Sequence, residues 1–359
     1  MSGYFANAHG APCPTLVLDG QGLPEETDEL LDSLTAIRAD LSADGAGDVL
    51  KNAIVRPSAH PLFDLDYRFV QSLPQSHASF DLRGSCGHSI LAAVEAAARS
   101  GMIPPLVPGA RVRVNVLNNG DNVVCEVEET SDGGTSFTAH FLCTPTKPYA
   151  ELLMTGEPVT EVHVDRMVVP VSLVSMGNPY VFVPARHLGV ETKEQLFAAD
   201  GKLFDQFARI RLAVCEQQGW DPSGAFPKIA AVLPQEGGAL AVRAVSVPSW
   251  HPTLALTGAI CLGTAVGIEG TVPWSLAWNS GYREGLVTLV TPGGELQVSA
   301  SSVRTETGPR LAWVSVAGKR VDYQGWAGLP AARFPYAAAP SLSTSPSSSQ
   351  ERACLPLPV

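Results

Sequence analysis

The stretch FDLRGSCGHSILAAVEAAARSG, residues 80–101, decides the fold. It places a cysteine between two glycines and continues into a run that is apolar on nearly every side. A helix with apolar residues on all its faces must be surrounded by protein. Because the neighbouring apolar runs are short and of the β type, this stretch predicts a helix buried inside a shell of strands.

A second segment of the same kind, LTGAICLGTAVGIEG at residues 256–270, lies about half a chain later. Each segment is flanked by short runs that alternate polar and apolar residues, as half-buried antiparallel strands do. We therefore expect an α+β fold of two pseudo-symmetric β-rich domains, residues 1–166 and 167–332, each curled around a central apolar helix. Amphipathic runs at 24–42 and 203–219 predict surface helices, and the Ser/Pro-rich tail at 333–359, which contains Cys354, is expected to be disordered.

The composition narrows the classes of partner. The chain has 359 residues, 45% of them hydrophobic and 16% charged, and a net charge of -11. Without a basic tract, this charge argues against nucleic acid or an anionic membrane as a partner. No apolar run reaches the roughly 20 residues that span a bilayer. Seven dispersed cysteines and an N-terminus unlike a secretion signal predict free thiols in a reducing compartment, so we expect a cytoplasmic protein.

The position of Cys86 has a chemical consequence. Unpaired N–H groups and a partial positive charge at a helix N-terminus stabilise a thiolate, and they can lower a thiol pKa from about 8.5 to roughly 3.5–7.5. Gly84 and Gly87 would let a ligand approach the backbone, where free N–H groups can hold a carboxylate. Cys86 is therefore a candidate acid or base acting on a bound carboxylate. A small buried hydrophobe in a tight turn is the alternative, and the local sequence favours neither.

Several motifs resemble, in order and spacing, those of the PrpF-like isomerases in the diaminopimelate-epimerase-like superfamily. They are GSCGHSILAAVEAAARSGMI, LKNAIVRPS followed by DLDYRFVQ, VSMGNPYVFVPARHLG, PKIAAVLP, VRAVSVPSWHPTLALTGAICLGTAVGIEGTV and TPGGELQVSA. The resemblance implies an active site in the cleft between two epimerase-like domains. It also implies an isomerase that needs no cofactor and no metal. The substrate would be a small unsaturated polycarboxylic acid, such as aconitate or methylaconitate, whose C=C bond is shifted or changed in cis/trans geometry.

The resemblance assigns the proton chemistry to Cys86 and Lys51. Without it, Lys51 would be taken for a solvated surface residue. Shifting a double bond requires a proton to be removed beside a carboxylate and one to be returned elsewhere on the allylic system, which suits a base and an acid of near-neutral pKa. Residues expected to bind substrate are Ser85, Gly87, His88, Ser246, His251, Thr257 and Gly258.

Departures from the family pattern leave other functions open. AHGAPCPT replaces the family's RGGTSKG loop, and Ser85 and His88 stand where two Asn are usual. These changes favour, as the alternative, a non-catalytic protein that binds carboxylates. A cofactor-independent racemase or epimerase would use a second cysteine at the start of the second central helix, but that position falls near Ala255. A homodimer is also left open.

Overall fold

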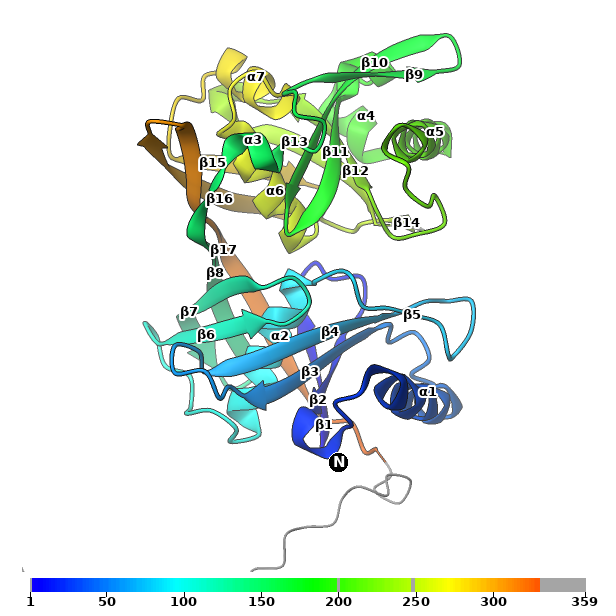
Figure 1. Cartoon of the computed structure of the whole chain (residues 1–359), viewed down its shortest axis with the longest axis vertical. Coiled ribbons are helices and arrows are strands. Elements are labelled where there is room, and N and C mark those ends of the chain that lie inside the picture. Colours follow the sequence, from blue (N-terminus) through cyan, green and yellow to red (C-terminus); the bar gives the residue numbers. More distant parts are fainter. Residues whose placement is uncertain (1, 199–200, 247–248, 330–359) are drawn as a thin grey trace, which may run out of the picture.

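Two β-rich halves are stacked along the long axis of the molecule (Figure 1). The computed structural model describes residues 2–198, 201–246 and 249–329. Each half curls around one central helix, α2 (Gly87–Arg99) or α6 (Leu256–Val266). The tail at 333–359, predicted to be disordered, lies outside the described residues. None of the described helices is long and apolar enough to cross a membrane.

Strands β1 to β8 surround α2 in the first half. Strand β2 pairs in parallel with β3, which pairs antiparallel with β4, and β4 is followed by β6 in parallel and then by antiparallel β7 and β8. Helix α1 packs on the outer face (Figure 1). The other elements are β1 (Gly3–Ala8), β2 (Thr15–Asp19), η1 (Gly20–Gly22), α1 (Thr27–Ala43), β3 (Lys51–Pro57), β4 (Leu65–Ser72), β5 (Phe80–Asp81), β6 (Arg111–Val116), β7 (Asp121–Ser131) and β8 (Gly134–Pro148).

The second half surrounds α6 in the same manner, with α4 and α5 outside (Figure 1). Strand β11 pairs in parallel with β12, β12 pairs antiparallel with β13, and β13 is followed by β15 in parallel and then by antiparallel β16 and β17. The elements are α3 (Tyr149–Leu152), β9 (Thr160–Val164), β10 (Met167–Met176), β11 (Asn178–Pro184), η2 (Ala185–Leu188), α4 (Lys193–Ala198), α5 (Gly201–Gln218), β12 (Lys228–Pro234), η3 (Glu236–Gly238), β13 (Leu240–Ser246), β14 (Ser249–Trp250), α7 (Val272–Asn279), β15 (Leu286–Thr291), β16 (Gly294–Thr305) and β17 (Gly308–Trp326).

The halves share one order of pairing. A parallel pair, β2–β3 or β11–β12, is followed by an antiparallel partner, β4 or β13, and then by a two-residue strand, β5 or β14. The central helix follows that short strand in each half. The weak repeat in the sequence is therefore a repeat of topology.

Both central helices are buried on every face, as their sequences predict. All residues from Gly87 to Ala97 of α2 are buried, and so is the whole of α6. Burying one large apolar side chain contributes about 1.5–3 kcal/mol. Small residues let the strands approach closely: a Cβ at Gly263 would lie 2.3 Å from Val298. The predicted surface helices are present as α1 and α5, each packed over its own apolar cluster.

Two long strands, β8 and β17, connect the halves (Figure 1). They pair antiparallel with each other, and β17 also pairs with β16 of the second half and with β1 of the first. The hairpin of β9 and β10 spans the predicted boundary at residue 167. The division of the chain into domains at that residue stays a prediction, whereas the pairing shows that the last part of β17 returns to the first half.

Candidate active site

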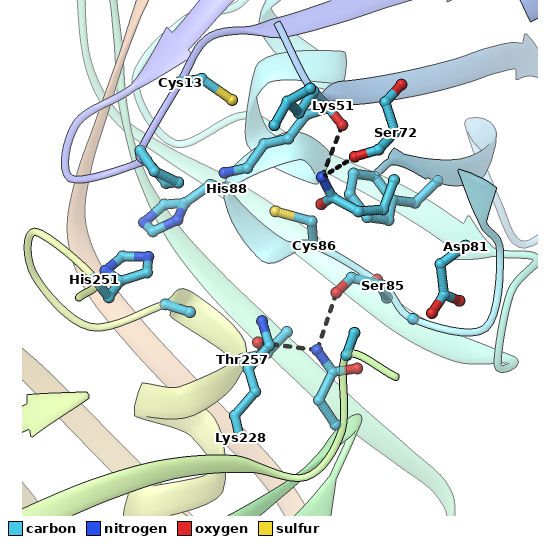
Figure 2. Close-up of a pocket in the computed structure, with 18 of the residues that line it drawn as sticks. Cys13, Lys51, Ser72, Asp81, Ser85, Cys86, His88, Lys228, His251 and Thr257 are labelled. Carbon is cyan, nitrogen blue, oxygen red and sulfur yellow. Dashed lines mark hydrogen bonds between the residues drawn. The ribbon is translucent and has the colours of Figure 1, made fainter. Parts of the chain in front are cut away.

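The N-terminal ends of the two central helices meet between the halves. Gly87, the first residue of α2, packs against Leu256, the first residue of α6, and a Cβ at position 87 would come within 2.5 Å of that side chain. The side-chain amide of Asn178 donates to the Ser85 carbonyl oxygen (3.1 Å) and to Thr257 Oγ1 (3.3 Å), as Figure 2 shows. The N–H groups without intrahelical partners at both ends therefore lie in one region.

A cavity of about 300 Å³ opens where the helix ends meet. This volume is at the lower end of the range for small-molecule pockets. Both halves form its walls, through strand starts, the turns before the central helices and the loop before β12. Its polar and ionisable side chains are Cys13, Asp48, Lys51, Gln71, Ser72, Asp81, Ser85, Cys86, His88, Asn178, Lys228, Ser249, His251 and Thr257.

Cys86 is the N-cap residue of α2, and its half-buried side chain faces the cavity. The Tyr67 hydroxyl donates to the Cys86 carbonyl oxygen (3.2 Å) and so supports the turn. Burial raises the pKa of the thiol, but the Lys51 ammonium, hydrogen bonds from the Ser89 hydroxyl and backbone N–H, and the Lys228 ammonium lower it. The net result is a pKa below the ordinary cysteine value, so the site stabilises a thiolate.

Lys51 is the first residue of β3, and its side chain enters the cavity toward Cys86 (Figure 2). Only 6% of the residue is exposed. Its backbone is fixed because β3 pairs with β2 on one side and β4 on the other. A buried cation is costly unless an opposite charge compensates it, so the Lys51 ammonium favours the thiolate form of Cys86.

His88 and His251, one from each half, form a stacked pair on the cavity wall. Their ring centroids are 6.0 Å apart, and the rings are inclined by 16°. Within the described part of the chain, His88 Nε2 is buried without a hydrogen-bond partner. Burial first, and then the charges of Lys319 and Lys51, lower the pKa of His88 well below its ordinary value, and burial does the same for His251. Both rings are therefore neutral near pH 7 and can form hydrogen bonds with a ligand.

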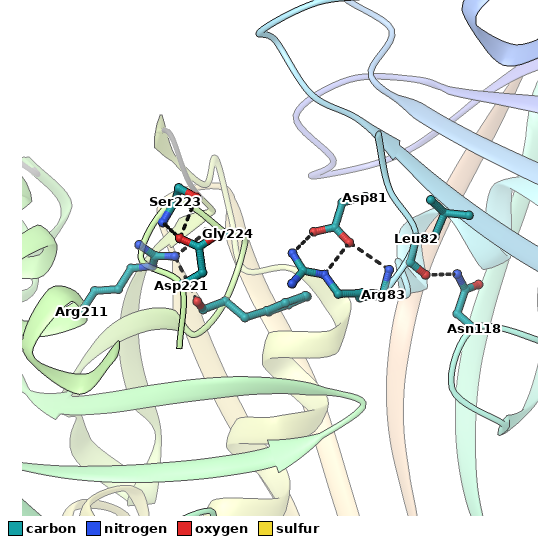
Figure 3. A network of polar contacts seen from close by, with 9 residues as sticks. Asp81, Leu82, Arg83, Asn118, Arg211, Asp221, Ser223 and Gly224 are labelled. Carbon is teal, nitrogen blue, oxygen red and sulfur yellow. Dashed lines mark hydrogen bonds and ion pairs between the residues drawn. The ribbon is translucent and has the colours of Figure 1, made fainter. Parts of the chain in front are cut away.

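Hydrogen-bonded loops from both halves flank the cavity (Figure 3). In the first half, Arg83 binds the Asp81 carboxylate through its guanidinium (2.8 Å) and its backbone N–H (2.9 Å). In the second half, Arg211 of α5 donates to the carbonyl oxygens of Pro222 (2.8 Å) and Pro227 (2.9 Å). These bonds fix the turn that leads into α2 and the loop that leads into β12, so the wall is held before any ligand arrives.

A family model described as PrpF protein matches residues 20–330, most of the chain. The chain belongs to the PrpF family. YbhH of Escherichia coli (strain K12), provisionally named an isomerase, is 31% identical to this PrpF protein over 305 residues, which cover 78% of this chain and 86% of YbhH. The 2-methyl-aconitate isomerase of Cupriavidus necator is 26% identical over 377 residues, which cover 92% of each chain.

Among solved structures, the crystal structure of methylitaconate-delta-isomerase matches this PrpF protein with a TM-score of 0.66 at 23% identity. The match covers 90% of this chain and 94% of that one. It confirms the predicted α+β, diaminopimelate-epimerase-like fold. The chain is an enzyme of the isomerase class, as its named relatives are.

Most of the predicted site residues of the PrpF protein lie on one cavity. The predicted residues that line this cavity are Lys51, Ser85, Cys86, Gly87, His88, His251 and Thr257. Gly258 lies behind the wall, where a Cβ would come within 2.6 Å of the Tyr180 hydroxyl, so its small size serves helix packing. Ser246 ends β13 and pairs with Ser249 through the backbone, while its side chain lies outside the described part.

Among the lining residues that sequence reasoning missed, Lys228 and Asn178 matter most for the chemistry of the cavity. Lys228 could have been found by aligning PKIAAVLP with LKNAIVRP, because the two segments share Lys, Ala, Val and Pro at matching positions. Asn178 has no comparable signal. Its bridging role depends on how the two halves pack.

Proposed function

We propose that this protein shifts a C=C bond in an unsaturated polycarboxylic acid, with Cys86 and Lys51 as the proton-transferring pair. The observation that carries the proposal is the juxtaposition of the Cys86 thiol, at the N-terminus of α2, with the Lys51 ammonium inside the cavity. The relatives named for 2-methylaconitate and methylitaconate support this substrate class, since both acids are unsaturated polycarboxylates.

The proposed reaction transfers protons only. The Cys86 thiolate removes a proton from a carbon beside a carboxylate, and the electron pair spreads over the allylic system and the carboxylate oxygens. The Lys51 ammonium returns a proton to the other end of that system. The Cys86 thiol then passes its proton to the Lys51 amine, directly or through water, so both residues regain their starting forms and the product is an isomer of the substrate.

The surroundings of the pair suit the charge that develops. N–H groups at the N-termini of α2 and α6 face the region where carboxylate oxygens would gather. Fixed donors in a water-poor site stabilise such an oxyanion without reorganisation, and losing one of them typically costs about 10²–10³ in rate.

The test is solvent exchange into candidate acids. In D₂O, we expect the wild-type protein to incorporate deuterium into methylitaconate, 2-methylaconitate or trans-aconitate and to form the isomer, both followed by NMR. Cys86→Ser and Lys51→Met should each slow exchange by about 10²–10⁴-fold, the usual contribution of a positioned acid or base. The exposed Lys202 on α5 supplies a matched control, Lys202→Met, which should exchange like the wild type. Undiminished exchange in both site variants would rule out the proposed pair.

The same assay tests the two alternatives. Pro12 and Cys13 line the cavity where the family's charged loop would lie, which is the observation in favour of a non-catalytic binding protein. Calorimetric binding of these acids without deuterium uptake would establish that function instead. A two-thiol racemase is disfavoured because Ala255 is the N-cap residue of α6 and contributes no thiol.

A further inference from the structure

Lys228 is the structural counterpart of Lys51. Lys51 begins β3 and faces Thr15 of the parallel strand β2, while Lys228 begins β12 and faces Tyr180 of the parallel strand β11. In each half, the lysine follows the outer helices and precedes the antiparallel strand of the shared topology. The internal repeat therefore delivers two lysines to one cavity, one from each half (Figure 2).

The thiol is not repeated in the same way. Cys86 is the N-cap residue of α2, and the corresponding N-cap residue of α6 is Ala255. Lys51 thus has a thiol at the adjacent helix end of its own half, whereas Lys228 has only a methyl group there. Without a thiol at the adjacent helix end of its own half, Lys228 is suited to holding a negative charge rather than to moving a proton.

The charges and hydrogen-bond donors around Lys228 suit the binding of an anion in the cavity. Burial lowers its pKa, the Cys86 thiolate raises it, and the Lys51 ammonium lowers it. On the same cavity, the Asn178 amide donates to Thr257 Oγ1 at the first turn of α6, and the N-terminal N–H groups of that helix add further donors. A carboxylate placed here would therefore meet an ammonium and a helix N-terminus together.

The position of Lys228 is also fixed in advance. The loop before it is held by Arg211, which Figure 3 shows. The Arg211 guanidinium donates to the carbonyl oxygens of Pro222, Pro227 and Phe226, the last at 3.1 Å. The Phe226 ring lies 6.0 Å from the Lys228 ammonium and packs against Gly84 of the first half. A binding group anchored in this way loses little conformational freedom when a ligand arrives.

We propose that Lys228 binds the substrate carboxylate that is remote from the Cys86–Lys51 pair, and that the enzyme therefore prefers substrates on which that carboxylate is free and charged. The inference rests on the proposed function, because it takes Cys86 and Lys51 as the reacting pair. The first carboxylate lies beside the reacting carbons and accepts charge there, while the second is held across the cavity by the second half of the molecule.

The experiment compares acids that differ by one charge. The probes are the acid that exchanges fastest in D₂O and the same acid with each carboxylate in turn converted to its methyl ester. We expect wild-type kcat/KM to be about 10- to 100-fold higher for the free acid than for the ester at the remote position, the loss typical of a charge-assisted hydrogen bond. In Lys228→Met this preference should fall below about 3-fold, because turnover of the free acid drops much more than turnover of the ester.

Further variants separate binding from folding and from thiol activation. Lys228→Gln is a second neutral variant, Lys228→Arg should restore part of the preference, and Lys202→Met should keep all of it. The Lys228 ammonium also lowers the pKa of Cys86, and losing that effect would slow turnover of the free acid and of the ester equally. The ratio of their kcat/KM values therefore reports carboxylate binding alone. Ester turnover also shows that a variant is folded.

The outcomes distinguish the two proposals. If the wild-type protein exchanges no proton in any acid, the proposed function fails and the role of Lys228 fails with it. If the wild-type protein turns over the free acid and both neutral Lys228 variants keep its preference for that acid, only the role of Lys228 is overturned.

Discussion

The Cys86 thiol is subject to two opposing effects. Burial favours the neutral thiol, whereas Lys51, the two hydrogen bonds from Ser89 and then Lys228 favour the thiolate, and the second group prevails. The other central helix carries Cys261, where burial raises the thiol pKa to about 12 although hydrogen bonds with the backbone of Met176 and Tyr180 lower it. The two thiols therefore differ because of their neighbours, although each lies on a central helix.

This difference predicts selective alkylation. In a Cys13→Ser background, the rate at which iodoacetamide alkylates Cys86 should reach half its maximum at a pH below the ordinary pKa of cysteine. Lys51→Met should move that midpoint upward, because the thiolate loses the nearest positive charge. The measurement is alkylation rate against pH with mass-spectrometric site assignment. Lys202→Met serves as the control, and an unshifted midpoint in Lys51→Met would contradict the assignment.

The buried histidine pair predicts acid sensitivity. The pKa of His88 lies well below its ordinary value, so the folded state keeps the ring neutral while the unfolded state takes up a proton below about pH 6.5. Stability should therefore be insensitive to this group above pH 6.5 and fall as the pH drops. One histidine of this kind lowers the free energy of unfolding by about 1.4 kcal/mol at pH 5.5, relative to its value well above pH 6.5.

Urea unfolding at pH 7.5 and 5.5 measures this effect. His88→Asn replaces the ring with an amide that does not titrate, so the loss between the two pH values should shrink by about 1 kcal/mol. If the wild type and His88→Asn lost the same free energy of unfolding between the two pH values, His88 would take up its proton in the folded state as readily as in the unfolded chain.

At the scale of elements, the close approach of α2 and α6 sets the geometry of the cavity. A Cβ at Gly87 would meet three atoms of the Leu256 side chain within 3.0 Å. Gly87→Ala should therefore separate the helix ends, lower stability by about 1–3 kcal/mol as overpacking does, and reduce activity. Urea denaturation and the exchange assay measure the two effects.

A matched control exists at Gly201, the first residue of α5, where a Cβ would meet no atom of the described residues within 4 Å. Gly201→Ala should be neutral or stabilise by less than about 1 kcal/mol. In a Leu256→Ala background, Gly87→Ala should lower stability less, because two of the three clashing atoms, Leu256 Cγ and Cδ2, are removed and only Cβ remains. If Gly87→Ala cost no more than Gly201→Ala, contact between the helix ends would not constrain position 87.

At the scale of the molecule, the halves are joined by strands and by polar contacts, one of which is made by Asn178. Strand β17 pairs with strands of both halves, and Asn178 hydrogen-bonds the turn before α2 and the first turn of α6. The strands keep the halves together, whereas Asn178 sets how their helix ends are aligned around the cavity.

Asn178→Ala should therefore lower both stability, by about 1–3 kcal/mol, and kcat/KM. Asn115→Ala is the matched control, since Asn115 donates to Asp66 Oδ1 (2.9 Å) entirely within the first half. It should lower stability without changing kcat/KM. Equal effects on kcat/KM in the two variants would contradict a specific role for Asn178 in aligning the site.

Much of the fold could be read from local patterns. Apolar residues on every face predicted α2 and α6 as buried helices, and alternating runs predicted the strands, because burial of a face leaves a periodic trace in the sequence. The position of Cys86 at a helix N-terminus followed from its neighbouring glycines. The pairing of Lys51 with Cys86 came only from family resemblance, since an isolated lysine at a strand start carries no such signal.

The sequence by itself determined which segments are buried and which chemical groups the chain offers at helix and strand ends. Only the tertiary structure decided that His88 stacks on His251, that Asn178 bridges the two helix ends, and that Lys228 shares a cavity with Lys51. These contacts join residues of different halves. Their geometry depends on how two completed β-rich units pack against each other, and local periodicity carries no record of that packing.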